Sequence, residues 1–330
     1  MDPVAKVMPL PADDGGGVLT DCAYSQAGDR MATCSSSGGV RIWDCSSTSG
    51  GGGGGGEPQL LHAEKLSEEA TKVAWAPDEV GPICAVGTAR GGVRVLRGGL
   101  GGGWGPGGKL ACGRGAVRDL AFAPAQHGLV LAAASEDGCV YIHEGALAPD
   151  GGSSSSGGGG GVLAWTLLSK IQANDAGPCA CLAWRPFTAG VPPLLLAASA
   201  RGAKAWCYHS AAWQESGELE SPAAAPAAAL HWASTLGRPY ELAAAAFGSD
   251  AAIFRLDGAP RALRAARLAL LPHPGRVWRV EFSGRGNALG ASVEGGGSGS
   301  PPEVRLYMPD LGGSWCGVSR VAGGADAAQA

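Results

Sequence analysis

Charged residues are scarce in this chain of 330 residues: they make up 16% of the sequence, whereas apolar residues make up 45%. This composition excludes a highly charged, disordered polypeptide. The net charge is −4, so no positive field would attract phosphates, and we expect no direct binding of nucleic acid. No apolar run approaches the roughly 18 residues that a membrane helix needs. Since residues 1–12 also lack the pattern of a secretion signal, we expect neither secretion nor insertion into a membrane.

The ten cysteines lack the spacing of metal and redox motifs. Most stand singly between small or apolar residues, as Cys34 and Cys84 do. The one close pair, Cys179 and Cys181, is separated by a single residue where zinc ribbons and redox motifs use two, and no second pair completes four ligands. The pattern predicts buried free thiols in a reducing compartment and no metal site.

Signatures of catalysis and of phosphate binding are also missing. Residues 103–110 place glycine and lysine at the spacing of a P-loop, but Leu110 stands where a hydroxyl residue belongs and no helix pattern follows. The other glycine tracts would lose too much conformational entropy on ordering to form a phosphate cradle. None of the six histidines shows the H-E-x-x-H spacing, and no G-x-S-x-G elbow joins a strand to a helix. We expect no enzyme, no cofactor and no small-molecule substrate.

Glycine and proline, with 57 and 22 residues, separate the elements of an internal repeat. Each of six copies begins with an extended run that ends at an aromatic residue, and these residues stand 51, 47, 62, 48 and 50 positions apart. A run of small apolar residues, a tight turn and a run of β-branched and aromatic residues follow, so each copy predicts three strands. The six aromatic residues are Tyr24, Trp75, Phe122, Trp184, Trp232 and Phe282.

A more polar fourth strand is predicted at the end of each copy, at residues 60–66, 109–113, 165–172, 213–220, 264–271 and 314–321. The alanine- and arginine-rich stretch 261–271 also fits a short helical turn. Repeats of this length with four strands indicate an all-β fold, a WD-repeat β-propeller with six four-stranded blades. We predict a single domain over residues 1–330, with blades beginning near residues 18, 70, 116, 178, 227 and 276.

Glycine- and serine-rich tracts account for repeats longer than the roughly 40 to 45 residues that are usual for WD repeats. Such tracts behave as flexible chain, so we predict disordered loops at exposed tips and no domain linkers. They span residues 50–56, 98–108, 150–161 and 294–302.

Alternation within the strands predicts which side chains are buried. In residues 277–282 we expect Trp278, Val280 and Phe282 on one face and Val277, Arg279 and Glu281 on the other. Tryptophans recur in register on the repeat strands, which favours packing between blades over an aromatic platform for a ligand. They are Trp43, Trp75, Trp184, Trp206, Trp232 and Trp278.

Several stretches resemble the Seh-type nucleoporins, WD-repeat propellers related to the Sec-thirteen coat protein. Residues 30–44 and 117–145 are similar to the first and third blades of that family, and 276–282 is shared by both branches. The doubled cysteine in 179–186 and the fifth-blade pattern in 236–256 favour the Seh branch. The Trp-Asp pair survives only at residues 43–44 and the Gly-His signature is absent, so we expect blades held by apolar packing.

The resemblance implies an open ring of six blades that an α-solenoid nucleoporin completes by donating a blade in trans. It implies a scaffold subunit of the Y-shaped outer-ring subcomplex of the nuclear pore, with other members of that subcomplex as partners and a role in transport of protein and mRNA. It also implies a second place at the lysosomal or vacuolar periphery, in a nutrient-signalling complex. An open ring exposes blade faces and strand edges, so we expect low solubility without the partner.

The position of the gap predicts partner contacts on the first and last blades. The predicted partner-binding residues are Val40, Ile42, Trp43, Trp278, Val280, Phe282, Val304 and Leu306. Packing of each residue inside its own propeller is an equally good reading, and whether residues 4–10 add a strand to the open blade is left open. Two other functions remain: a Sec-thirteen-like subunit of the COPII vesicle coat, and a propeller that binds peptides or hydrolyses a small substrate at its central channel.

Overall fold

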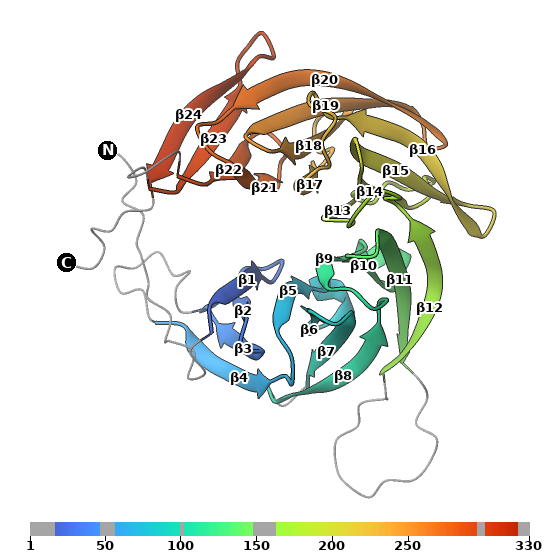
Figure 1. The fold of residues 1–330 in the computed structure, drawn as a ribbon, viewed down its shortest axis with the longest axis vertical. Helices are drawn as coiled ribbons and strands as arrows, with labels where there is room; N and C mark the ends of the chain where they lie inside the picture. The colour runs from blue at the N-terminus through green and yellow to red at the C-terminus, as the bar shows by residue number, and fades with distance from the viewer. Residues whose placement is uncertain (1–16, 47–56, 100–101, 148–162, 296–300, 323–330) are drawn as a thin grey trace, which may run out of the picture. The chain divides into compact units, whose positions relative to one another are not determined.

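The computed structural model describes residues 17–46, 57–99, 102–147, 163–295 and 301–322 (Figure 1). These residues form six four-stranded antiparallel sheets, each built from strands that are consecutive in the chain. The fold is therefore all-β, a β-propeller with six blades, as the repeats predict. By internal packing the described chain divides into two compact units, residues 17–172 with blades 1 to 3 and residues 173–322 with blades 4 to 6.

The first unit holds twelve strands. Blade 1 consists of β1 (Leu19–Tyr24), β2 (Arg30–Ser35), β3 (Gly39–Asp44) and β4 (Gln59–Lys65). Blade 2 consists of β5 (Ala70–Trp75), β6 (Ile83–Thr88), β7 (Gly92–Gly98) and β8 (Trp104–Ala111). Blade 3 consists of β9 (Val117–Phe122), β10 (Leu129–Ser135), β11 (Cys139–Leu147) and β12 (Leu163–Gln172). Two short 3-10 turns, η2 (Asp78–Val80) and η3 (Ala125–His127), follow the first strands of blades 2 and 3.

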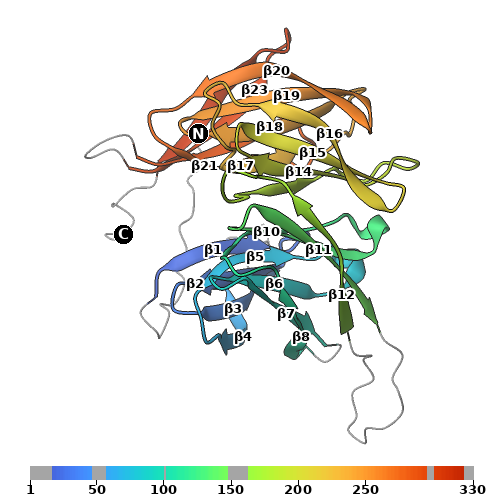
Figure 2. The same cartoon turned by 45° about the vertical axis from the view of Figure 1, so that its right-hand side comes forward.

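The second unit repeats this order. Blade 4 consists of β13 (Leu182–Trp184), β14 (Leu194–Ser199), β15 (Gly202–His209) and β16 (Ala212–Glu220). Blade 5 consists of β17 (Ala229–Trp232), β18 (Glu241–Phe247), β19 (Asp250–Ala259) and β20 (Ala262–Pro272). Blade 6 consists of β21 (Val277–Phe282), β22 (Leu289–Val293), β23 (Glu303–Pro309) and β24 (Trp315–Ala322). Figure 2 shows the stacking of these sheets within the unit from a second direction.

The aromatic residues that define the repeat lie where the sequence predicts them. Each one is the last residue of the first strand of its blade, from Tyr24 in β1 to Phe282 in β21. The Trp-Asp pair at residues 43–44 ends β3. The stretch 261–271 forms β20, which pairs with β19 along its length, so the helical alternative is wrong there.

The loop predicted at residues 98–108 is shorter than expected. β7 continues to Gly98 and β8 begins at Trp104, so residues 99–103 alone connect the two strands. Glycine is tolerated in β8 because the strand pairs with β7 and Trp104 packs edge-on against Trp75, with ring centroids 5.6 Å apart. The loops predicted at 50–56 and 150–161 lie outside the described residues, as does most of 294–302.

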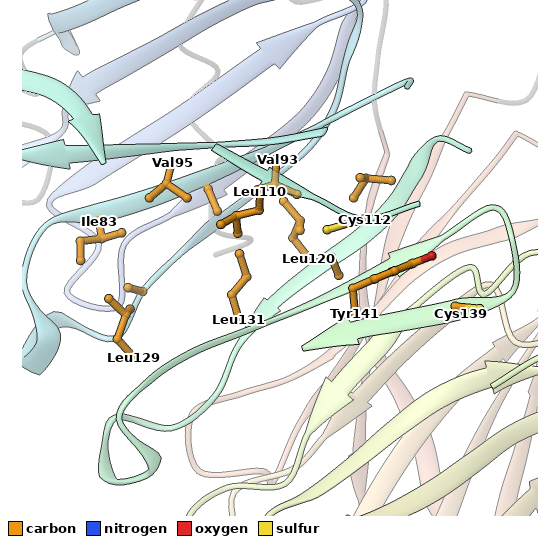
Figure 3. Packing of buried hydrophobic residues seen from close by; sticks show 14 residues of the cluster. Ile83, Val93, Val95, Leu110, Cys112, Leu120, Leu129, Leu131, Cys139 and Tyr141 are labelled. Atoms are coloured by element: carbon orange, nitrogen blue, oxygen red, sulfur yellow. The ribbon is translucent and has the colours of Figure 1, made fainter. Parts of the chain in front are cut away.

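Small side chains in the second strands let neighbouring blades pack closely. β18 reads ELAAAAF, and its residues Ala243–Ala246 are fully buried. Between blades 2 and 3, branched residues from β6, β7, β9 and β10 interlock around Leu131 (Figure 3). Close packing of this kind stabilises each sheet, because it removes from water apolar surface that a single sheet would leave exposed.

The cysteines belong to this packing. All ten are thiols that form no disulfide in the part of the chain that the structure describes, and eight are buried, with Cys22 and Cys316 exposed. Burial raises the pKa of Cys34 to about 11 and that of Cys112 to about 12, so these thiols stay protonated at neutral pH. No helix in the described chain is long and apolar enough to cross a membrane.

Candidate functional site

A β-bulge in the first strand aims one side chain at the next blade. In β1 and β5 the pairing with the second strand skips Thr20 and Thr71. Each of these hydroxyls donates a 2.7 Å hydrogen bond to the main chain of the following blade, Thr20 to Ala70 O and Thr71 to Val117 O. Bulges re-aim a side chain in this way because the extra residue is left out of the ladder.

The same bulge occurs in blade 6, where the skipped residue is Trp278. Trp278 stands four positions before the aromatic end of its strand, as Thr20 and Thr71 do. Its side chain is 53% exposed, and the guanidinium of Arg276 lies 4.3 Å from the ring centroid. A large apolar side chain therefore occupies, in the last blade, the position from which Thr20 and Thr71 contact the next blade. In blade 3 the residue at this position is Arg118, which pairs with Glu136 of its own blade.

The bulge also corrects the predicted alternation in β21. Val277, Val280 and Phe282 are buried and pack in one core cluster with blade 5. Trp278 is exposed, on the side that also holds Arg279 and Glu281. The prediction of Trp278 as a buried packing residue is wrong because the bulge shifts the period of two by one residue.

The other face of blade 6 is partly apolar. Val304 and Leu306 are 39% and 37% exposed, and Val321 lies directly opposite Val304 on β24. Met308 follows at the same spacing and is exposed to a similar degree. This free face of blade 6, Trp278 with Val304, Leu306, Met308 and Val321, packs against no other blade of its unit within the described chain.

Blade 1 also has a face turned away from blade 2. Tyr24, Met31, Trp43 and Leu60 stand directly opposite one another on β1, β2, β3 and β4. Met31 and Trp43 in the middle are buried, whereas Tyr24 and Leu60 at the ends are more than half exposed. This row forms the free face of blade 1.

The predicted partner-binding residues are divided by their burial. Trp278, Val304 and Leu306 are exposed, but the other five residues are buried. Val40 and Ile42 pack on blade 2, and Val280 and Phe282 pack on blade 5. Trp43 donates its indole N–H to Thr33 Oγ1 at 3.1 Å. The expectation that these five side chains are exposed is wrong. Val40, Ile42, Val280 and Phe282 point into the apolar core between neighbouring blades, whereas Trp43 is buried on the other face of blade 1 with Met31 and Cys45.

Four residues of the free faces were not among the predicted residues: Tyr24, Leu60, Met308 and Val321. Their exposure follows from the register of pairing, which single-strand alternation does not give. One signal for Trp278 was present in the sequence, since aligning the repeats places it with Thr20 and Thr71.

Tryptophans elsewhere hold blades together. Trp75 donates its indole N–H to Ala23 O of blade 1 at 3.0 Å, which confirms the predicted packing between blades for that residue. In the second unit Glu241 accepts hydrogen bonds from Trp232 Nε1 at 3.0 Å and from Arg185 Nε at 2.9 Å, joining blades 4 and 5.

Two histidines contribute to the contact between blades 5 and 6. His231 Nδ1 accepts a 3.2 Å hydrogen bond from the Phe282 N–H, and His273 Nε2 lies 2.9 Å from the Tyr307 hydroxyl. Burial lowers the pKa of both imidazoles, so they are neutral at pH 7. No group of three or more His, Cys, Asp or Glu residues in the described ranges could hold a metal ion.

Six consecutive four-stranded blades with this repeat define the protein as a WD-repeat β-propeller. A model of the WD domain, G-beta repeat, matches residues 6–44. Two solved structures share the fold. A chain of the mitotic checkpoint complex has 16% identity and a TM-score of 0.61, and the match covers 85% of this chain and 73% of that one. Sqt1 of Chaetomium thermophilum, bound to the N-terminus of ribosomal protein L10, has 19% identity and a TM-score of 0.59, and the match covers 90% of this chain and 72% of that one.

More particularly, the chain is similar to the SEH1 proteins. It is 26% identical to Protein SEH1 of Arabidopsis thaliana, covering 90% of this chain and 93% of that protein. It is also 26% identical to Nucleoporin SEH1 of Homo sapiens, covering 92% and 85%. Nucleoporin seh1 of Schizosaccharomyces pombe matches with 28% identity over 51% and 48%. The resemblance to the Seh-type nucleoporins is thereby confirmed.

Proposed function

We propose that this chain is a structural, non-catalytic subunit of the nuclear pore scaffold, which binds an α-solenoid nucleoporin through the free faces of blades 1 and 6. The similarity to proteins named Nucleoporin SEH1 over nine-tenths of the chain supports the place in the pore. A single observation supports the mode of binding: Trp278 occupies the bulge position from which Thr20 and Thr71 contact the following blade.

In this proposal residues 1–330 act as a single propeller domain to which the partner adds a blade. The free face of blade 6 and the free face of blade 1 would each supply contacts for that added blade. Main-chain pairing and apolar side chains both favour such strand addition. The contact residues are Trp278, Val304 and Leu306 with Met308 and Val321 on blade 6, and Tyr24 and Leu60 on blade 1. Val40, Ile42, Val280 and Phe282 are buried on the opposite faces of blades 1 and 6, and Trp43 is buried in the middle of the row on blade 1.

Affinity purification from nuclear envelopes tests the proposal. The tagged full chain is expected to recover an α-solenoid nucleoporin and other members of the Y-shaped subcomplex. Recovery of vesicle-coat cage proteins without pore proteins would refute it and favour the COPII alternative. Specific peptide binding by the purified chain, abolished by changes in channel loops, would favour the adaptor alternative.

A pair of substitutions distinguishes binding through the free face of blade 6 from non-specific binding through exposed apolar residues. Trp278→Ala is expected to lower recovery of the solenoid partner at least about ten-fold, as expected when a central aromatic contact is removed. Leu236→Ala is the control, because Leu236 is a 71% exposed apolar residue of blade 5, in the turn between β17 and β18, and is not part of the free face of blade 6. Equal loss with both variants would contradict the assignment. The roles in protein and mRNA transport and the second place at the lysosome or vacuole stay predictions.

A further inference from the structure

A polar cleft lies between blades 1 and 2, within one compact unit and apart from the free faces described above. Its volume is about 420 Å³. Its walls come from the end of β4, the link to β5, and the strands β7 and β8. Lys65, Glu68, Arg94 and Lys109 are its charged lining residues together with Glu64.

Like charges face each other across two strands of this cleft. Arg94 on β7 and Lys109 on β8 are directly opposite in the register, an arrangement that destabilises a sheet unless an anion offsets it. Glu64 of blade 1 offsets Arg94, with Oε1 2.8 Å from Nη2. Lys65 and Lys109 are exposed, and neither forms an ion pair with any residue of the described ranges.

Two buried polar atoms in the lining have no hydrogen-bond partner in the described chain. They are Arg94 Nε, which is a donor, and Glu68 Oε2, which is an acceptor. Buried polar groups in folded proteins are nearly always paired, so an unpaired donor and an unpaired acceptor in one cleft indicate a ligand that brings both functions.

The link that places Glu68 is fixed at both ends. Leu66 N–H donates to Gly38 O at 2.8 Å, and Ala89 N–H donates to Glu69 O at 3.0 Å. Gly38 has a φ of +85°, and a Cβ there would stand 2.5 Å from Glu68 O, so a side chain at position 38 would push the link away. The main chain that carries Glu68 is therefore held in place before any ligand arrives.

We propose that this cleft binds an acidic peptide segment of a partner protein. Glu68 Oε2 and Arg94 Nε are covered in this structure, so the two side chains turn toward the cleft when the peptide binds. A main-chain amide then pairs with both, its N–H with the Glu68 carboxylate and its carbonyl with the Arg94 guanidinium, and an Asp or Glu side chain next to it pairs with Lys65 and Lys109. The net charge of the whole chain is −4, so attraction of an acidic peptide depends on this local arrangement and not on the overall field.

Two immobilised libraries of capped random heptapeptides test the proposal, one with Asp or Glu fixed at the centre and one with Asn or Gln there. At about 0.15 M salt the Debye length is about 8 Å, so long-range attraction is screened. The full chain is expected to be retained about three- to ten-fold more on the acidic library, the range of one or two partly exposed ion pairs. Equal retention on both libraries would overturn the proposal.

Three variants locate the binding. Lys109→Gln is expected to bring the retention ratio close to one, and Glu68→Met to lower retention on both libraries. The control is Arg320→Gln, because Arg320 stands opposite Arg305 at the matching place in blade 6, where no buried carboxylate oxygen of the described chain is unpaired. Equal loss with Arg320→Gln would refute a site between blades 1 and 2.

Two measurements make these outcomes decisive. The urea midpoint of Glu68→Met is expected to equal or exceed that of the parent chain, because a buried unpaired carboxylate is removed, so lost binding is not lost folding. Displacement by 1 mM inorganic phosphate without any preference for the acidic library would assign the cleft to small anions and overturn the peptide proposal.

Discussion

Replacing Arg185 by methionine should destabilise the second unit more than the loss of an exposed ion pair would. Glu241 accepts hydrogen bonds from Arg185 and from Trp232, and the Arg185 and Glu241 side chains are only 11% and 18% exposed. Removing the guanidinium leaves a mostly buried carboxylate without its counter-charge, which costs about 3 to 5 kcal/mol for a fully buried pair. With the residual exposure discounted, we expect about 2 to 4 kcal/mol for Arg185→Met.

A double variant tests the reasoning behind this value. In Arg185→Met with Glu241→Gln the unpaired charge is gone, while the glutamine carbonyl still accepts from Trp232. We expect the double variant to recover about half of the loss, because most of the penalty is the stranded charge. Urea unfolding of the full chain, followed by tryptophan fluorescence, measures each free energy.

Arg118→Met is the control for the same experiment. Arg118 Nη2 lies 2.7 Å from Glu136 Oε1, but both side chains are 47% exposed, so its loss should cost under about 1 kcal/mol. A double variant as unstable as Arg185→Met, or a control as costly as Arg185→Met, would refute the reasoning.

Three further predictions follow from burial. Burial lowers the pKa of His143, His231 and His273. The stability that these neutral imidazoles contribute is therefore complete above the pKa of histidine in the unfolded chain, near 6.5, and is lost as the pH falls below it. A urea midpoint that does not drop between pH 7.5 and pH 5.5 would contradict this. Ala244→Leu overfills the contact between blades 5 and 6 and should cost about 1 to 3 kcal/mol, whereas Ala266→Leu on exposed β20 should leave the thermal midpoint nearly unchanged. Iodoacetamide at pH 8 should modify Cys22 and Cys316 within minutes and the eight buried thiols only after unfolding, which mass spectrometry measures.

Two of the contacts between neighbouring blades depend on the same bulge in the first strand. Thr20 and Thr71 reach the next blade because a bulge turns their side chains out of their own ladder. Trp278 has the same position in blade 6, which is the last blade of the described chain. In our proposal the neighbour of blade 6 is a blade of the partner protein, and at the position that faces it the apolar Trp278 replaces the hydroxyl residue of blades 1 and 2. The free face of blade 6 thereby differs in chemistry from the faces that the chain covers by itself.

The amino-acid sequence by itself determined the number of blades and the ends of their first strands. Aromatic residues from Tyr24 to Phe282 recur at near-constant spacing, and small, β-branched and polar runs follow in fixed order. These are local patterns, and local propensity with binary alternation decides them.

Tertiary structure alone decided which side chains remain free. Val280 is buried and Trp278 exposed because a bulge moves the register, and Val40 is covered because blade 2 packs on it. The cleft of Arg94, Lys109 and Glu68 joins segments of two blades and has no sequence motif. Register and contacts between blades depend on residues distant in the chain, so no window of sequence contains the information that sets them.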